Sequence, residues 1–327
     1  MSKQRVLSGM QPSGLLHLGN LMGALDNWRK LQDQYECYYF IADWHALTTN
    51  YADTSNIRTY VREMVTDWLA AGLDPEKCVI FKQSLVPEHA VLHLLLSMST
   101  PLPWLERVPT YKEKIDQIQD KDMNTYGFLG YPVLQAADIL IYKAHFVPVG
   151  VDQLPHLELT REICRRFDQF YGEVFPEPLP LLTEYPKLPG TDGRKMSKSY
   201  NNTLNLSDSP EDITKKIMQM VTDPARVRRQ DPGNPDVCPL FTLDKIFAPK
   251  KWCDYVNVEC RRAGIGCVDD KKELLKHLLA YLKPIQDKRK ELVAQPDRVR
   301  EIIAEGSHKA RAVAQQTLAE VNEAMKL

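Results

Sequence analysis

Strand-like runs alternate with helical patterns through the first half of this sequence. Runs rich in β-branched and aromatic residues occupy 5–9, 37–42, 78–81 and 145–150, and a helix-like stretch follows each. Parallel strands need such crossovers, so the alternation predicts an α/β fold with a Rossmann-like doubly wound parallel sheet. After residue 204 the strand-like runs stop. Ser209 and Pro210 have the pattern of a helix cap and first turn, so a smaller all-helical domain is expected there.

Composition limits the classes of protein that this chain can belong to. It is 43% hydrophobic and 26% charged over 327 residues, which is typical of a globular protein. No apolar run approaches the roughly 18 residues of a membrane span, and no signal-peptide pattern is present, so we expect a cytoplasmic protein with no membrane partner. The seven cysteines indicate free thiols or metal ligands. The net charge of −1 gives no general attraction to nucleic acid, so we expect no DNA partner and only local basic sites for RNA.

Two strand-to-helix turns carry candidate binding residues. In "SGMQPSGLLHLGN" (8–20), Gly14 and Gly19 allow close backbone approach, the helix N-terminus offers unpaired N–H groups to a phosphate, and His17 would face that anion. In "VGVDQLPHLELTR" (149–161), Asp152 stands at the second turn. The carboxyl ends of parallel strands share one edge, so both turns can face one pocket. A surface histidine and an ordinary Asp cap are the alternatives.

The stretch "RKMSKSY" (194–200) places two lysines in a segment that is neither helix nor strand core. Lys195 and Lys198 on a mobile loop can bring cations onto a polyphosphate as negative charge builds up. A solvated surface loop is the alternative.

These motifs together resemble a known family. His17-Leu18-Gly19-Asn20 and the "KMSKS" run resemble the two signatures of class I aminoacyl-tRNA synthetases, and "GMQPSG", "GVDQLPHLELTR" and "PGTDGRKMSKS" resemble the bacterial tryptophanyl enzymes. The resemblance extends from residue 5 to the C-terminal region and implies ATP-dependent attachment of L-tryptophan to tRNA(Trp). The reaction would pass through tryptophanyl-adenylate and release AMP and pyrophosphate, with Mg²⁺ bridging phosphates. No protein nucleophile is needed.

The resemblance also implies a division of the chain and of its site residues. We expect a catalytic domain at 1–190, a mobile loop at 191–204, a helical anticodon-binding domain at 205–292, and a C-terminal helix at 293–327 that packs back toward the catalytic domain. His17, Lys195 and Lys198 would be catalytic. The residues implied to hold ATP are Gln11, Pro12, Ser13, Gly19, Asn20, Gly150, Val151, Asp152, Leu188, Lys195, Met196, Ser197, Lys198 and Ser199.

The amino-acid pocket is expected around "YPVLQAADILIY" (131–142), a segment that tryptophanyl and tyrosyl enzymes share. The residues implied are Tyr131, Gln135, Asp138, Gln153 and His45. Asp138 is the one charge in an apolar run, and a buried carboxylate requires a donor. An indole N–H or a phenol hydroxyl fits, and so does a backbone group or an arginine. A tyrosyl enzyme, a non-catalytic nucleotide- or tRNA-binding relative and a generic nucleotidyltransferase are the alternative functions.

Basic residues and one apolar segment are candidates for contacts with partner molecules. Candidate tRNA contacts are Arg226, Arg228, Arg229, Lys112 and Lys114. The family implies a homodimer, and we assign its interface to the apolar segment 91–104.

Some bacterial members hold a 4Fe–4S cluster on four cysteines. Cys238, Cys260 and Cys267 match three of these ligand positions, but Asp270 stands at the fourth. Cys253 is a possible substitute ligand. Three free thiols in a helical domain are the alternative.

Overall fold

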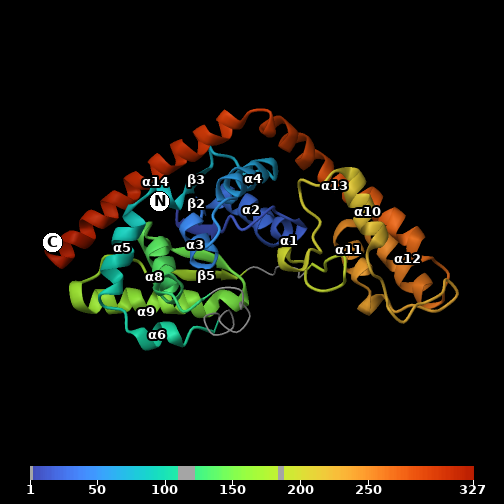
Figure 1. Cartoon of the computed structure of the whole chain (residues 1–327), viewed down its shortest axis with the longest axis horizontal. Helices are drawn as coiled ribbons and strands as arrows, with labels where there is room; N and C mark the ends of the chain where they lie inside the picture. The colour runs from blue at the N-terminus through green and yellow to red at the C-terminus, as the bar shows by residue number, and fades with distance from the viewer. Residues whose placement is uncertain (1–2, 110–121, 183–187) are drawn as a thin grey trace.

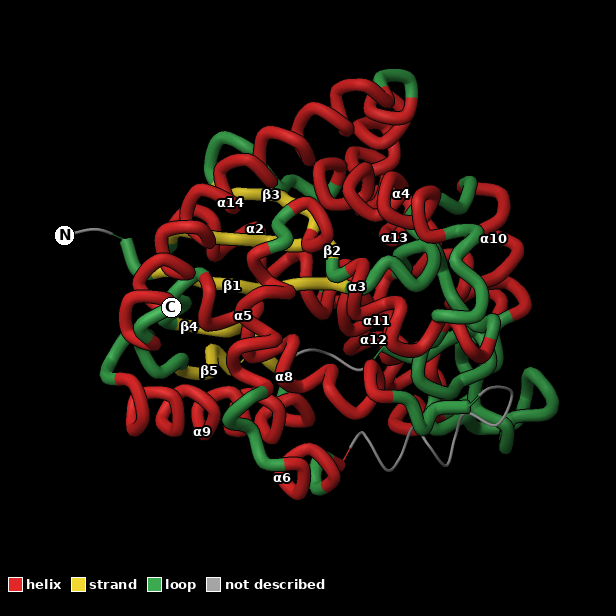
Figure 2. Tube along the Cα trace, turned by 60° about the vertical axis from the view of Figure 1, so that its left-hand side comes forward, coloured by secondary structure: helices red, strands yellow, loops and turns green. Residues whose placement is uncertain are grey.

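A five-stranded parallel sheet forms the centre of the computed structural model, which describes residues 3–109, 122–182 and 188–327 (Figure 2). The strands are β1 (Arg5–Met10), β2 (Glu36–Ile41), β3 (Cys78–Lys82), β4 (Phe146–Val149) and β5 (Leu179–Leu182), in the order β3-β2-β1-β4-β5. The four strands expected from the sequence are confirmed to within one residue at most ends. The edge strand β5 was missed because "LPLL" is short and contains a proline.

Helices cover both faces of the sheet, because successive strand residues alternate between two cores. Val6 and Tyr39 belong to the core that includes α2 (Asp26–Gln34) and α4 (Ile57–Ala70). Leu7 and Phe40 belong to the opposite core. That second core includes buried residues of α5 (Glu88–Ser97), α8 (Tyr126–Ile141) and α9 (Leu154–Tyr171).

Shorter elements join these layers. They are α1 (Leu18–Asn20), the π-helix η1 (Leu21–Leu25), α3 (Asp43–Asn50), α6 (Leu102–Glu106) and the 3₁₀ turns η2 (Gln83–Leu85), η3 (Val151–Gln153) and η4 (Lys198–Tyr200).

The region after the sheet is helical, as the sequence predicts, and lies to one side of the α/β part (Figure 1). Its elements are α10 (Pro210–Gln219), η5 (Pro235–Val237), α11 (Pro239–Phe247), α12 (Lys250–Arg261) and α13 (Cys267–Val293). Ser209 caps α10 by accepting a hydrogen bond from the Asp212 amide. Among the described residues, no helix is long and apolar enough to cross a bilayer.

The last helix, α14 (Pro296–Met325), runs back across the sheet and covers the edge strand β3 (Figure 1). A Cβ on Gly306 would lie 1.9 Å from the Ile80 carbonyl oxygen, so only glycine permits this approach. The Ser307 hydroxyl accepts a hydrogen bond from the Lys82 amide at 3.1 Å. The helix thereby blocks an edge on which another chain could otherwise pair.

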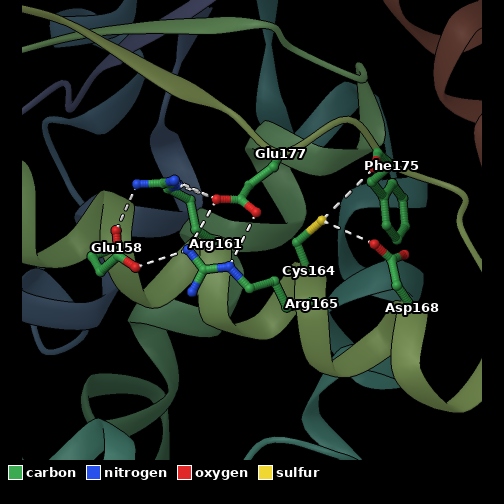
Figure 3. Close-up of polar contacts among 7 residues, drawn as sticks. All are labelled: Glu158, Arg161, Cys164, Arg165, Asp168, Phe175 and Glu177. Atoms are coloured by element: carbon green, nitrogen blue, oxygen red, sulfur yellow. Dashed lines mark hydrogen bonds and ion pairs between the residues drawn. The ribbon is translucent and has the colours of Figure 1, made fainter.

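An ion-pair network joins α9 to the segment that leads into β5 (Figure 3). Glu177 pairs with Arg161 and Arg165, and both arginines also pair with Glu158. These groups are partly exposed, so each pair contributes little to stability on its own. The network fixes α9 relative to β5 and therefore helps to place the turn that precedes α9.

Candidate active site

A cavity of about 240 Å³ opens where β1 and β4 separate. In the described sheet these two strands pair at Val6 and Phe146, and β4 continues with Pro148, which has no N–H to donate. The strand order reverses at this point, which is where parallel α/β sheets bind ligands. Its lining comprises Leu7, Ser8, Gly9, Gln11, Phe40, Ala42, His45, Gln135, Asp138, Ile139, Val147, Pro148, Val149 and Gln153.

Asp138 lies at this cavity with its carboxylate fully hydrogen-bonded. Gln83 Nε2 donates to Oδ1 at 2.8 Å and to Oδ2 at 2.9 Å. His89 Nδ1 donates to Oδ1 at 2.6 Å, and His45 Nε2 donates to Oδ2 at 2.7 Å. Burial alone would raise the pKa of Asp138, but the charges and hydrogen bonds of the two histidines outweigh burial and lower it to about 2. The carboxylate is therefore ionised.

The donors to Asp138 differ in part from those expected from the sequence. The alternative that a backbone group or an arginine satisfies the carboxylate is wrong, because two histidines and a glutamine supply the donors. Pairing of Asp138 with the indole N–H of a ligand stays a prediction. Gln83 and His89 were missed. Each is far from Asp138 along the chain, and neither stands in a distinctive motif. The one sequence signal for His89 was its position in an apolar helix, α5, where a buried histidine needs a polar partner.

His17 occupies the turn between β1 and the first helix as a buried, neutral imidazole. Burial, and then the charge of Lys198, lower the pKa of His17 to about 4. Its Nδ1 accepts a hydrogen bond from the Gly19 amide at 3.1 Å. In the neutral ring the proton is then on Nε2, which can donate to a phosphate oxygen.

The helix after His17 does not offer unpaired N–H groups, so that expectation is wrong. The amide of Leu18 donates to the Leu204 carbonyl, that of Gly19 to His17 Nδ1, and those of Asn20 and Leu21 to the His17 carbonyl. The Asn20 side chain accepts from the His17 amide and completes a capping box. An anion at this turn would therefore be bound by side chains and not by the backbone N–H groups at the start of the helix.

Lys198 is docked on the same turn. Its Nζ donates to the Gly14 carbonyl at 3.0 Å, across 184 residues of sequence. Gly14 has φ +135°, and a Cβ there would lie 3.0 Å from Lys198 Cδ, so glycine is required both for the backbone and for the lysine stem. Burial lowers the pKa of Lys198 to about 8, although the charge of Asp67 raises it.

The segment around the two lysines is anchored at its base. Asn202 Nδ2 donates to the Asp192 carboxylate and the Lys195 carbonyl, and its Oδ1 accepts from the Ser197 amide. Met196 is buried beside Leu188, whose carbonyl accepts from the Met196 amide. These two apolar residues therefore support the loop.

The two lysines of this loop differ in their surroundings. Lys195 is exposed, whereas Lys198 is packed against the Gly14 turn. Ser199, like Lys195, is exposed.

The remaining sequence-derived residues divide between two places. Gln135, His45, Gln153 and Gln11 line the cavity with Asp138, whereas Tyr131 lies outside that lining, beside His156 on α9. The residues at the two turns and the loop, outside the cavity lining, are Pro12, Ser13, Gly19, Asn20, Gly150, Val151, Asp152, Ser197 and Ser199.

The candidate cluster ligands do not form a metal site in this arrangement. Within the described residues no three His, Cys, Asp or Glu side chains are grouped to hold a metal ion. Arg226 Nη1 lies 3.8 Å from the thiols of Cys260 and Cys267. Asp270 accepts from the Trp252 indole, and the Cys253 thiol points to the Asp244 carbonyl. The arrangement of these side chains does not fit a 4Fe–4S cluster.

Comparison with known proteins places the chain in a family. Residues 1–283 match the family described as tRNA synthetases class I (W and Y). The sequence is 56% identical to the tryptophan–tRNA ligase of Thermotoga maritima over 99% of each chain. The chain belongs to the class I tryptophanyl-tRNA synthetases. The tryptophan–tRNA ligase of Aquifex aeolicus is 46% identical over 99% of this chain and 100% of its own.

Solved tryptophanyl-tRNA synthetases share the whole architecture. The enzyme from Campylobacter jejuni, complexed with ADP and tryptophan, matches with a TM-score of 0.89 and 35% identity, over 99% of this chain and 100% of its own. A tyrosyl-tRNA synthetase of Archaeoglobus fulgidus matches with a TM-score of 0.66 and 22% identity, a likeness of fold alone. The tryptophanyl interpretation is confirmed over the tyrosyl one.

Proposed function

We propose that the chain is a tryptophan–tRNA ligase whose cavity holds the amino acid and whose two signature segments hold ATP. The observation that carries this proposal is the contact between Lys198 and Gly14. It joins a loop far along the chain to the turn that contains His17, next to the cavity at the strand-order reversal. ATP would lie between these segments, with magnesium arriving as its counterion.

Two group transfers complete the reaction. A tryptophan carboxylate oxygen attacks the α-phosphorus of ATP, the new O–P bond forms, and pyrophosphate leaves with the electrons of the bond that breaks. The terminal ribose hydroxyl of the tRNA then attacks the adenylate carbonyl carbon, the bond from that carbon to the phosphate oxygen breaks, and AMP leaves while the hydroxyl proton passes to solvent. Such transfers depend on positioning and on stabilising charge at the phosphates. His17 would donate from neutral Nε2, Lys198 would act as a nearby cation, and the exposed Lys195 would approach when ATP is bound.

Tryptophan would enter with its indole toward Asp138. The carboxylate already accepts four hydrogen bonds, which fills its lone-pair sites. Of its three donors, His45 lines the cavity, while Gln83 and His89 do not. The indole N–H would therefore take the place of His45 at Oδ2. Gln11, Gln135 and Gln153 offer polar groups to the rest of the ligand.

Binding of tRNA(Trp) and dimerisation are further parts of the proposal. Arg228 and Arg229 are exposed, but Arg226 is turned inward, where it donates to the Ile265 carbonyl, so it is the weaker candidate for a tRNA contact. Lys112 and Lys114 lie outside the described residues. Segment 91–104 exposes apolar side chains, which suit a homodimer interface. They are Val91, Leu94, Met98 and Leu102.

The cell compartment proposed is the cytoplasm. All seven cysteines are free thiols, as is usual in a reducing compartment.

ATP–pyrophosphate exchange tests the function directly. We expect exchange that depends on tryptophan and not on tyrosine, and that falls at least about 100-fold in Lys198→Ala. Exchange driven equally well by tyrosine would overturn the amino-acid assignment. Exchange unchanged by Lys198→Ala would overturn the site.

A further inference from the structure

A second cavity, of about 450 Å³, opens between α4, the end of β3 and the first turns of α14. Helices α4 and α14 pack against each other here (Figure 1). The described residues that line it are all different from those that line the cavity with Asp138, and none belongs to segment 91–104. Sites for small molecules usually have volumes of roughly 300–1,000 Å³. The cavity is therefore large enough for a ligand, and it is separate from both the reaction cavity and the proposed dimer surface.

The buried part of this lining is apolar. On α4, Ile57 and Val61 stand one turn apart and share one face of the helix. On α14, Val299 and Ile303 have the same spacing. The Leu85 side chain of η2, which is 45% exposed, completes the apolar surface. A ligand that covered this surface would remove it from water, which favours binding.

Among the residues that the structure describes, four cations and no carboxylate line the rest of the cavity. They are Arg58 and Arg62 on α4, Lys82 at the end of β3, and Arg300 on α14. Like charges one turn apart on a helix repel each other, so Arg58 and Arg62 do not stabilise α4. Arg58 makes no hydrogen bond or ion pair with any described residue. An anion in the cavity would supply the missing partner.

The other three cations have acidic partners outside the lining, but these pairs are weak. Lys82 Nζ lies 3.5 Å from Asp43 Oδ2, and Arg62 Nη2 lies 3.4 Å from Glu63 Oε1. Arg300 pairs with an aspartate three residues earlier on the same helix, and its side chain is 72% exposed. Ion pairs this long or this exposed contribute little. The positive charge around the cavity therefore remains available to a ligand.

We propose that this cavity is a second ligand site, for a small molecule with an apolar body and an anionic head, either a carboxylate or a phosphate monoester. The body would lie on the apolar surface of α4 and α14, and the head would meet Arg58 and Arg300 from the two helices. Arginine suits this role because its planar guanidinium donates two parallel hydrogen bonds to a carboxylate or a phosphate. The phosphate backbone of RNA needs no apolar surface, so the combination favours a small amphiphile.

The test is isothermal titration calorimetry of the full chain with decanoate and, as the uncharged comparison, decanol. We expect saturable binding of one decanoate per chain, roughly tenfold tighter than that of decanol. An apolar cavity without the cations would prefer decanol, because a carboxylate costs more to take out of water. Saturating tryptophan and ATP, which would fill the reaction cavity, should leave the affinity for decanoate unchanged.

Three variants show whether the probe occupies this cavity. Arg58→Gln combined with Arg300→Gln should weaken decanoate binding by roughly tenfold, since it removes two exposed ion pairs with the head. Ala304→Trp should abolish binding, because Ala304 lines the cavity at an exposed position where a larger side chain can fill it. Arg298→Gln is the matched control. It removes an exposed arginine of the same helix that lies outside the lining, and it should leave the affinity at the parent's value.

Several results would overturn this site. Decanol binding as tightly as decanoate would remove the role of the cations, and displacement of decanoate by tryptophan and ATP would place the probe in the reaction cavity. Parent-like binding in Ala304→Trp, or an equal loss in Arg298→Gln and the double variant, would also refute the proposal. If Ala304→Trp does not fold, the double variant decides, because substitutions of exposed arginines are tolerated. Weaker tRNA binding in the double variant, with decanoate binding unchanged, would assign these arginines to nucleic acid instead.

Discussion

Replacing Asp138 by Asn should lower the free energy of unfolding, because it disrupts the buried hydrogen bonds that the carboxylate accepts from Gln83, His45 and His89. The substitution keeps the shape of the side chain but turns an acceptor of four hydrogen bonds into one acceptor and one donor. At least one of Gln83, His45 and His89 must then face the new NH₂ group without an acceptor. Breaking a buried charged partner in this way costs about 3–5 kcal/mol, out of a total of about 5–15 kcal/mol.

A second buried aspartate provides the control for this prediction. Burial, and then the charge of Asp270, raise the pKa of Asp244, which favours the neutral acid form of this side chain. Asp244→Asn exchanges one neutral group for another and should cost about 1 kcal/mol or less. Urea unfolding at pH 7 measures both variants, with unchanged slopes required for the comparison. Equal losses in the two variants would refute the assignment of an ionised, fully bonded Asp138.

The same variant tests amino-acid selection. If the indole N–H replaces His45 at Asp138, Asp138→Asn should weaken tryptophan use and relax the rejection of phenylalanine, which lacks that donor. Measuring exchange with both amino acids below the unfolding transition separates this effect from stability. Undiminished discrimination would mean that the indole binds elsewhere.

The remaining predictions concern the loop, the last helix and the proposed interface. Lys195→Ala should slow adenylate formation by about 2–4 kcal/mol in barrier with little change in tryptophan affinity, and a pre-steady-state rate equal to the parent's would contradict this. Lys198→Met should abolish tryptophan activation yet raise the free energy of unfolding by about 1–2 kcal/mol at pH 7, because the pKa of Lys198 in the folded protein, about 8, lies below the ordinary value of 10.5. This gain in stability should shrink as the pH rises from 8 to 10.5. A melting temperature below the parent's at pH 7 would refute the prediction. Gly306→Ala should cost about 1–3 kcal/mol or more, since the new methyl group meets the Ile80 carbonyl, and equal thermal stability would show that α14 lies elsewhere. Leu94→Asp should convert a dimer to a monomer in light scattering, and an unaltered mass would exclude this face.

Local patterns in the sequence determined the elements of the fold. The runs of β-branched and aromatic residues became β1 to β4, Ser209 became a helix cap, and the turn that contains His17 became the junction of strand and helix. Each of these depends on residues within a few positions of one another, so period and capping chemistry suffice to predict them. The family resemblance likewise depended on short contiguous motifs.

Tertiary structure decided which partners the functional groups have. Asp138 receives its donors from residues 49 to 93 positions away, and Arg289 reaches Asp67 across 222 positions. Arg226 Nη1 lies 3.8 Å from the thiols of Cys260 and Cys267, and no pattern around residue 226 predicts these neighbours. Such choices follow from how distant segments pack and from the demand that each buried polar group find a partner, and no local pattern contains that information.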